Sequence, residues 1–324
     1  AAGRCGEASR GGQGDAAGGT CRMSEPLDWD RDGRHWPHRD ASRFVTSGGI
    51  RWHVQVMGCE PGTAPILLLL HGTGASTHSW RGVMPALADR YTLVAPDLPG
   101  HAFTGRLPDA QMTLPGMATV ILGLIATLDI TPDVIIGHSA GAAIALTMAR
   151  ERDRFADTPI IGLNAALTPL PWPATQVFPA MARLLALNPL VPKVFSGVSR
   201  LAGDTAGFIQ RSTSSRIDRE GARCYATLLG NSRHARGALA MMANWDLDTL
   251  DHALPDIGNP VLLVHARGDN AIPLSGVEDA ARKLPHAQLE VLPALGHLAH
   301  EERPEDIAEL IAAFLGAHGV EGIG

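Results

Sequence analysis

Hydrophobic and polar positions alternate in two distinct ways along this chain from about residue 44 onward. Short, wholly apolar runs are bounded by Gly, Pro or Asp, as expected for β-strands that are covered on both faces. Between them lie longer stretches with apolar residues three or four positions apart, which is typical of helices packed on a sheet. Strands and helices that alternate in this order predict an α/β fold, with a mostly parallel twisted sheet and helices on both of its faces.

The expected elements can be placed by their residue numbers. Strands are predicted at residues 50–57, 65–70, 91–95, 133–137, 160–163, 260–265 and 287–292, the first of them antiparallel. Helices are predicted at residues 80–88, 114–128, 140–150, 274–283 and 304–317. Active sites in such sheets lie at the carboxyl ends of the strands, so the residues that follow each strand are the first to consider.

The alternation stops between residues 165 and 245. That segment is rich in Pro, Leu, Met and Ala, and we expect it to be a helical lid inserted into an α/β core formed by residues 23–164 and 246–324. Residues 1–22 are rich in Gly and Ala and lack the apolar run of a signal peptide. They are interpreted as a disordered tail or a mis-called start before Met23.

Composition limits the class of protein. Of the 324 residues, 45% are hydrophobic and 19% are charged, as in a globular protein with a large core, and the formal net charge of -6 argues against a nucleic-acid partner. No apolar run reaches the ~18–20 residues that a membrane span requires. The cysteines show neither metal-ligand spacing nor a disulfide framework, which favours a reducing cytoplasm. We expect no metal and no cofactor.

A candidate nucleophile follows one of the most apolar predicted strands. The sequence Gly137-His138-Ser139-Ala140-Gly141 matches G-x-S-x-G and lies between that strand and an Ala-rich helix. In this context the pattern favours a nucleophilic serine, whereas alone it also occurs in ordinary turns. The two glycines allow a turn tight enough to hold Ser139 in a strained conformation with its hydroxyl exposed.

An anion-binding site is predicted beside this serine. The sequence His71-Gly72-Thr73-Gly74 comes directly after the strand at residues 65–70. The backbone N–H of Thr73 can donate to an oxyanion, with the N–H of Ala140 as the second donor. His71 is interpreted as a residue that stabilises the loop rather than as a catalyst.

The other two catalytic groups follow the last two predicted strands. Asp269 ends the sequence VLLVHARGD, and His297 lies in the loop LGHL. Together with Ser139 they occur in the chain order Ser, Asp, His, which is one of the orders known for catalytic triads. His297 would take the proton of Ser139, and Asp269 would hold the imidazole in the required tautomer.

Five further polar residues lie near these positions. His300 completes an H-x-x-H pattern that alone is a weak metal signal, so a solvated or structural role is expected. The side chain of His138 is expected to point away from the nucleophilic hydroxyl. Asp97 and His101 are expected to shape the rim of the active site. Asn164 follows a strand from which a triad acid can also come, but it is an amide, which favours the later carboxylate.

Together these motifs resemble those of the α/β-hydrolase superfamily over about residues 44–318. In that family the loop after the fourth strand often reads D-x-x-G-x-G, and here Ala102 stands at the second glycine, a departure that affects the shape of this loop. The resemblance implies the α/β-hydrolase fold and a triad of Ser139, Asp269 and His297.

A narrower resemblance is carried mainly by the N-terminal run. Residues 27–44 read LDWDRDGRHWPHRDASRF and residues 49–55 read GIRWHVQ, followed by HGTGASTHSW at 71–80 and DLPGHAFT at 97–104. These segments are similar to the magnesium-chelatase accessory hydrolases of bacteriochlorophyll biosynthesis. The resemblance implies a cytoplasmic protein near photosynthetic membranes, with a porphyrin-like substrate and chelatase subunits as partners. It does not imply that this chain binds magnesium or ATP.

Two functions remain open on these grounds. The first is hydrolysis of an ester, amide or thioester through an acyl-serine intermediate, with an apolar or flat substrate favoured by lid residues such as Leu170, Trp172 and Phe178. The second is a non-catalytic accessory protein that binds a porphyrin or chelatase subunits through the same pocket. An intact triad favours the first. Epoxide hydrolases and haloalkane dehalogenases are disfavoured because they need a carboxylate where Ser139 stands.

Overall fold

One eight-stranded sheet runs through the described part of the chain, which comprises residues 25–169 and 204–323 of the computed structural model. The strand order is β1-β2-β4-β3-β5-β6-β7-β8. β1 pairs antiparallel with β2 and β2 antiparallel with β4, whereas all other neighbours are parallel. The strands are β1 Ser42–Ser47, β2 Ile50–Gly58, β3 Ile66–Leu70, β4 Thr92–Pro96, β5 Val134–His138, β6 Ile160–Leu163, β7 Val261–Ala266 and β8 Ala287–Leu292. The predicted α/β fold is confirmed.

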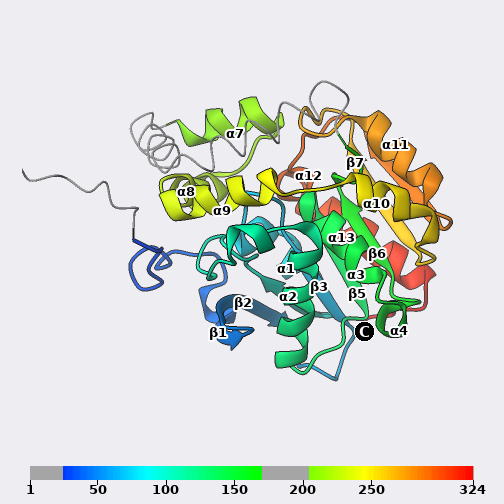
Figure 1. The fold of residues 1–324 in the computed structure, drawn as a ribbon, viewed down its shortest axis with the longest axis horizontal. Helices are drawn as coiled ribbons and strands as arrows, with labels where there is room; N and C mark the ends of the chain where they lie inside the picture. The colour runs from blue at the N-terminus through cyan, green and yellow to red at the C-terminus, as the bar shows by residue number, and fades with distance from the viewer. Residues whose placement is uncertain (1–24, 170–203, 324) are drawn as a thin grey trace, which may run out of the picture.

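Helices cover both faces of this sheet (Figure 1). One face carries α2 (Leu114–Thr127), α3 (Ala140–Ala149) and α11 (Leu274–Lys283). The other carries α1 (Val83–Leu87), α12 (Ala299–Glu302) and α13 (Pro304–Ala317). Short helices and 3-10 turns complete the core: η1 Arg39–Ala41, η2 Thr77–Trp80, η3 Asp109–Gln111, α4 Arg152–Phe155, α10 Asp248–Ala253 and η4 Leu254–Asp256.

Successive side chains of β3 point to opposite faces, so this five-residue strand contributes to two hydrophobic cores. Leu68 and Leu70 pack in the core under α2 and α3, and Leu67 and Leu69 pack in the core under α1 and α13. Because every position of the strand is buried, the run is wholly apolar. This is the pattern from which the strand was predicted.

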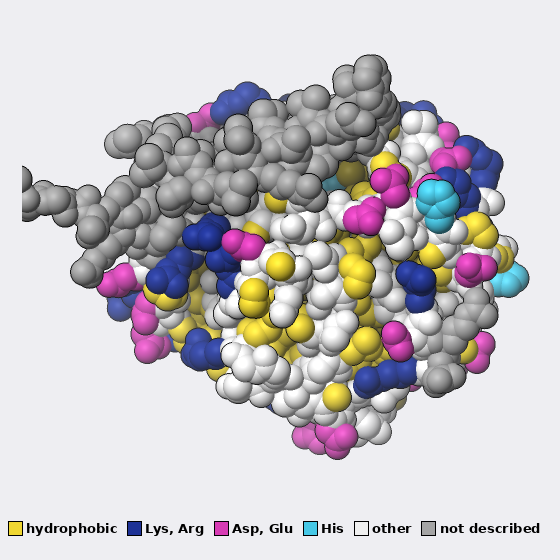
Figure 2. All heavy atoms as spheres, viewed as in Figure 1, with side chains coloured by type: hydrophobic (Ala, Val, Ile, Leu, Met, Phe, Trp, Pro, Cys, Tyr) yellow, Lys and Arg dark blue, Asp and Glu magenta, His cyan; other side chains and the backbone are white. Residues whose placement is uncertain are grey.

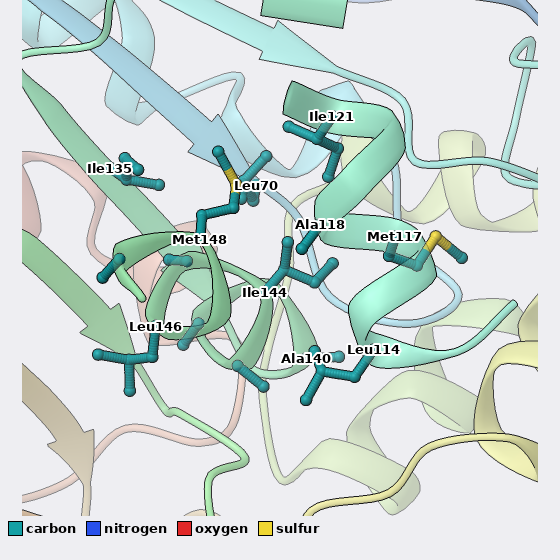
Figure 3. Close-up of a cluster of buried hydrophobic side chains, with 14 of the residues drawn as sticks. Leu70, Leu114, Met117, Ala118, Ile121, Ile135, Ala140, Ile144, Leu146 and Met148 are labelled. Atoms are coloured by element: carbon teal, nitrogen blue, oxygen red, sulfur yellow. The ribbon is translucent and has the colours of Figure 1, made fainter. Parts of the chain in front are cut away.

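Small residues bring α3 close to the sheet. Figure 3 shows Ile144 of α3 lying against Ala118 of α2 in the first core. A Cβ atom at Gly141 would collide with the backbone carbonyl oxygen of Leu70, so only glycine permits this approach. The beginning of α3 is thereby fixed against the carboxyl end of β3.

Most predicted elements end within one residue of the observed ones. The prediction lacks the edge strand β1 and the short helices α4, α10 and α12, and it joins two observed helices into one. β1 is missing from the prediction because its residues alternate between exposed and half-buried positions at the edge of the sheet, which leaves no apolar run. The helix predicted at residues 80–88 is divided into η2 and α1. Gly82 lies between them, where a Cβ atom would come within 2.5 Å of the Pro304 side chain.

Among the described residues, three helices lie within the segment for which a helical lid is predicted. They are α7 (Thr205–Thr213), α8 (Arg219–Leu229) and α9 (Ser232–Ala243). Figure 1 shows them together across the top of the molecule. The predicted tail at residues 1–22 and the apolar residues Leu170, Trp172 and Phe178 lie outside the described residues.

The charged side chains are mixed in sign over the surface in view. In Figure 2, Lys and Arg lie interspersed with Asp and Glu rather than in one basic patch. None of the helices within residues 25–169 and 204–323 combines the length and the apolar character of a membrane span. Over the same residues, no group of three or more His, Cys, Asp and Glu side chains is arranged to hold a metal ion.

Candidate active site

Five polar residues lie at the carboxyl ends of five adjacent strands. Thr73 follows β3, Ser139 follows β5, Asn164 follows β6, Asp269 follows β7 and His297 follows β8. These strands are neighbours in the order β3, β5, β6, β7, β8. Residues that are far apart in the sequence therefore line one edge of the sheet, the edge at which parallel α/β sheets form their binding sites.

The backbone of Ser139 adopts φ 51° and ψ -115°, a conformation that residues with a side chain rarely occupy. It is held there from both sides, because its N–H donates to the carbonyl of Leu163 (2.9 Å) and its carbonyl accepts from the N–H of Ala166 (3.2 Å). A Cβ atom at Gly137 would collide with the backbone of Ala142. The strained turn expected from G-x-S-x-G is therefore present.

Asp269 has a fully buried side chain that accepts four hydrogen bonds. Its Oδ2 accepts from Nδ1 of His297 (2.7 Å) and from the amide of Asn164 (2.8 Å). Its Oδ1 accepts from the N–H groups of Ala271 (2.7 Å) and Ile272 (3.0 Å). Burial alone would raise the pKa of this carboxyl, but the contacts with His297 and the other donors lower it. An ionised carboxylate only accepts, so Nδ1 of His297 carries the proton and its Nε2 has a free lone pair.

The contact from Asn164 is one that the sequence reasoning missed. Its amide group makes it a poor triad acid, but that group donates a hydrogen bond to Asp269, the candidate acid. Asn164 is buried with φ 44°, and its backbone N–H donates to the carbonyl of Val264 (2.8 Å). Asn tolerates the left-handed region better than most residues, so an Asn directly after a buried strand is a signal that could have pointed to it.

Two backbone N–H groups face the serine without a hydrogen-bond acceptor among the described residues, those of Thr73 and Ala140. Gly72 lets the backbone next to Thr73 approach Ser139. A Cβ atom at Gly72 would lie 3.1 Å from Cβ of Ser139 and 2.7 Å from Nδ1 of His138. Ala140 begins α3, whose N-terminal end carries the positive end of the helix dipole. The arrangement can stabilise negative charge that develops beside the hydroxyl.

His138 connects the serine turn to the loop of His297. Its Nε2–H donates to the backbone carbonyl of His297 (2.9 Å), and the two rings are 4.8 Å apart. Burial, and next the nearby His297, lower the pKa of His138 to about 3, so the ring is neutral near pH 7. His138 therefore acts on the backbone of the candidate base, a role that the sequence reasoning also missed.

Ser139 and His297 line one pocket with a volume of about 180 Å³. The largest apolar side chains in its described walls come from α7, α8 and the His297 loop: Phe208, Ile209, Tyr225, Leu229 and Leu298. A candidate nucleophile and a candidate base at the wall of an apolar pocket are the arrangement expected of an enzyme that acts on a small molecule.

Comparisons with known proteins agree with this geometry. Residues 65–304 match the family model described as alpha/beta hydrolase fold. This chain belongs to the α/β-hydrolase family. It is 40% identical over 286 residues to a Rhodobacter capsulatus protein named magnesium-chelatase 30 kDa subunit, covering 87% of this chain and 96% of that protein. Both the broad and the narrow resemblance inferred from the sequence are thereby confirmed.

Two further comparisons give lower sequence identities. The 2-(acetamidomethylene)succinate hydrolase of Mesorhizobium japonicum is 26% identical over 279 residues, covering 85% of this chain and 95% of that enzyme. The crystal structure of a putative lipase from Acinetobacter baumannii AYE superposes with a TM-score of 0.73 at 20% identity, covering 91% of this chain and 98% of that one. At this identity the likeness shows the common fold alone.

Within this hydrolase fold His71 stabilises the loop of Thr73, as expected. Its Nε2 accepts from the backbone N–H of Leu98 (2.8 Å), so its Nδ1 carries the proton and donates to the carbonyl of Gly72 (2.8 Å). Burial lowers the pKa of His71, which keeps the ring in this neutral form. The residue links the loop after β3 to the loop after β4.

The expectation that Asp97 and His101 shape the rim of the active site is wrong, because both side chains are fully buried. Asp97 accepts from Nδ1 of His53 (2.7 Å) and from the backbone N–H groups of Thr77 (2.8 Å) and Phe103 (3.2 Å). Burial alone would raise the pKa of Asp97, but His53 and the other contacts lower it to about 2. These contacts hold the loop after β4 in the protein interior.

His300 is structural rather than solvated. Its side chain is fully buried, with the ring 4.3 Å from that of His138 and 5.0 Å from that of Trp80. Neither ring nitrogen has a hydrogen-bond partner among the described residues. Burial lowers its pKa well below the ordinary value for histidine.

Proposed function

We propose that this protein is a serine hydrolase that cleaves an ester, amide or thioester through an acyl-Ser139 intermediate. One observation carries the proposal: a strained serine and a histidine with a free Nε2 line one apolar pocket, and the backbone N–H groups of Thr73 and Ala140 have no acceptor among the described residues. Each group has a separate task in acyl transfer. A protein that only binds a ligand has no need for all of them.

In the first half-reaction, the hydroxyl oxygen of Ser139 attacks the carbonyl carbon while Nε2 of His297 takes its proton. The carbonyl oxygen becomes anionic and is stabilised by the N–H groups of Thr73 and Ala140. His297 then gives the proton to the leaving oxygen, nitrogen or sulfur as its bond to carbon breaks. Water attacks the acyl group in the second half-reaction, and the acid and free Ser139 are released.

The pocket walls support a substrate with an apolar or flat group next to the reacting carbonyl. Phe208, Tyr225 and Leu229 of α7 and α8 form part of these walls, opposite the core residues that supply the chemistry. On this basis we also propose that residues 165–245 act as the lid of the site, through which the substrate is selected.

A fluorophosphonate probe tests the nucleophile directly. We expect the probe to label Ser139 of the wild-type protein, and we expect Ser139→Ala to abolish both labelling and the hydrolysis of p-nitrophenyl esters. Peptide mapping by mass spectrometry identifies the labelled residue. If the wild-type protein is not labelled, or if Ser139→Ala retains its esterase turnover, the proposal is wrong.

The similarity to the Rhodobacter capsulatus protein supports a role beside magnesium chelatase in bacteriochlorophyll biosynthesis. In this proposal the substrate is porphyrin-like, chelatase subunits are partners, and the protein acts in the cytoplasm near photosynthetic membranes. A strain that lacks the protein tests whether catalysis is the role. Wild-type protein should restore pigment synthesis and Ser139→Ala should not. Restoration by Ser139→Ala would favour the non-catalytic accessory that binds through the same pocket.

A further inference from the structure

The loop that carries His297 is bound to the helical insertion as well as to the core. The backbone N–H of His297 donates to the carbonyl of Thr213, the last residue of α7 (2.8 Å). The next N–H, of Leu298, donates to Oγ of Ser215 (2.8 Å). Both acceptors belong to the segment Thr213–Arg216, which ends α7 and leads toward α8, so that segment determines where the backbone of the candidate base lies.

The two segments pack backbone against backbone. A Cβ atom at Gly296 would collide with Oγ of Ser215 and would lie 2.6 Å from the carbonyl oxygen of Thr213. Ser215 is itself fully buried. No side chain fits between the loop and the insertion at this point, so a shift of one segment displaces the other.

Glu302 adds a second connection between the same segments. Its Oε1 accepts from the backbone N–H of Gly296 (2.8 Å), and its Oε2 accepts from the backbone N–H of Arg216 (3.0 Å). One carboxylate therefore holds a residue on each side of the contact. Hydrogen bonds from backbone N–H groups to a carboxylate are stronger than those to a neutral acceptor.

On its other side, the backbone of His297 is held by the core. Its carbonyl accepts from Nε2 of His138 (2.9 Å), and its ring donates to Asp269 (2.7 Å). The helical insertion thus binds the backbone N–H of His297, and the core binds its carbonyl and its ring. Ile209 and Thr213 of α7 also line the pocket, so the helix that touches the substrate space also touches the backbone of the base.

We infer that Ser215 and Glu302 are positioning residues for His297, and that the base is in place only while the segment Thr213–Arg216 is seated on its loop. The inference rests on the proposed function, in which His297 is the base. On this inference the helical insertion positions the base and also selects the substrate. Small displacements of a catalytic group are enough for a large loss of rate, since a shift of about 1 Å can cost about a hundredfold.

The variants Ser215→Ala and Glu302→Gln test the inference. The first removes the acceptor for Leu298, and the second replaces one of the two carboxylate oxygens with an amide that cannot accept from a backbone N–H. We expect kcat for a p-nitrophenyl ester to fall about tenfold in each, with KM changed less than about twofold, because the lost contacts act on the base and not on the substrate. Glu302→Ala, which loses both acceptors, should lower kcat further.

Thr227→Ala is the matched control. This hydroxyl lies on α8 and donates to the carbonyl of Arg223 within the same helix. Its removal should leave both kcat and KM unchanged. Thermal unfolding of every variant verifies that the protein is folded at the assay temperature.

The outcomes separate this inference from the proposed function. Failure of the fluorophosphonate probe to label wild-type Ser139 would contradict the proposed function itself. Normal labelling of the wild type, combined with wild-type kcat in folded Ser215→Ala and Glu302→Gln, would overturn the positioning role alone. A rise in KM with kcat unchanged would also overturn it, since that result describes a contact to substrate.

Discussion

Ser139 can keep its strained backbone conformation because the glycines on either side of it have no side chain. A φ of 51° costs a residue with a Cβ atom about 1–3 kcal/mol, and the packing of the turn must offset that cost. The contact at Gly141 is among the tightest, since a Cβ atom there would collide with the Leu70 carbonyl oxygen. Backbone atoms cannot rotate aside as the end of a flexible side chain can.

Gly141→Ala should therefore lower the free energy of unfolding by about 3 kcal/mol, at the upper end of the usual cost of overpacking. Gly123→Ala is its control, because a Cβ atom at that helical glycine would approach the rest of the protein no closer than 3.8 Å, at Oγ of Ser47. The control should raise stability by about 0.5–1 kcal/mol, since alanine restricts the unfolded chain more than glycine. Urea unfolding measures both. Equal effects at the two positions would contradict the packing argument.

Three residues around the candidate base differ in how well the sequence predicts their roles. Asp269 is predictable, because an acid at the end of a buried strand has few structural uses. Asn164 and His138 are not, because one donates to Asp269 across 105 sequence positions and the other to the carbonyl of His297 across 159. Nothing in the local sequence indicates which distant atom a buried donor will meet.

At the scale of elements, a buried ion network joins the core to α8. Arg81 donates to Glu301 of α12 (2.5 Å) and to Asp218 at the start of α8 (2.9 Å), and Tyr225 of α8 donates to Glu301 (2.7 Å). Burial alone would lower the pKa of Arg81, but the two carboxylates raise it, so the guanidinium stays charged. Because Tyr225 lines the pocket, the network fixes part of the pocket wall.

Glu301→Gln should lower the free energy of unfolding by about 3 kcal/mol, because removal of one partner leaves the buried charge of Arg81 without its closest counterion. Asp279→Asn is the control. Asp279 pairs at the surface with Arg282 and Lys283, and exposed ion pairs contribute little to stability because water and salt screen them. Guanidinium unfolding of both variants provides the comparison, and a similar small effect in each would show that the buried network adds little.

The elements themselves were largely predictable, for a physical reason. Strands covered on both faces must be apolar at every position, so β3, β5 and β7 stand out from the sequence. β1 lies at the edge of the sheet with exposed positions, and its residues carry no such requirement. The close packing at Gly82, between η2 and α1, involves Pro304, which lies more than two hundred positions away.

At the scale of the whole molecule, the fold holds many histidines in a neutral state. Burial is the largest cause that lowers the pKa of seven of them: His71, His78, His101, His138, His234, His265 and His300. For His138 the value falls to about 3 and for His234 to about 4. In the unfolded chain the same groups return to their ordinary pKa near 6.5.

Acid should therefore destabilise this protein well above the pH at which carboxylates titrate. As the pH falls through 6.5, the unfolded chain binds protons that the folded chain does not, so stability falls by about 1.4 kcal/mol per pH unit for each such histidine. The loss continues until the folded-state pKa is reached. We expect a steep decrease in the free energy of unfolding between pH 6.5 and 5, measured by urea titration at several pH values. A free energy of unfolding that stays constant over this pH range would contradict the prediction.

One variant isolates a single contribution to this profile. His300→Met removes two buried nitrogens that have no partner among the described residues, at similar side-chain volume. The slope of stability against pH should decrease by about one proton, or 1.4 kcal/mol per pH unit, while stability at pH 7.5 should not decrease by more than about 1 kcal/mol. An unchanged slope would mean that His300 is not a source of the acid sensitivity.

The sequence by itself determined the order of strands and helices and the position of the serine turn, because both follow from local rules: apolar periodicity and the need for glycine in a tight turn. It also placed Thr73, Ala140, Asp269 and His297 at strand or helix ends. Only the tertiary structure decided what surrounds them. The amide of Asn164, the ring of His138 and the segment Thr213–Arg216 reach the candidate base from distant parts of the chain, and such contacts arise from packing that no local pattern encodes.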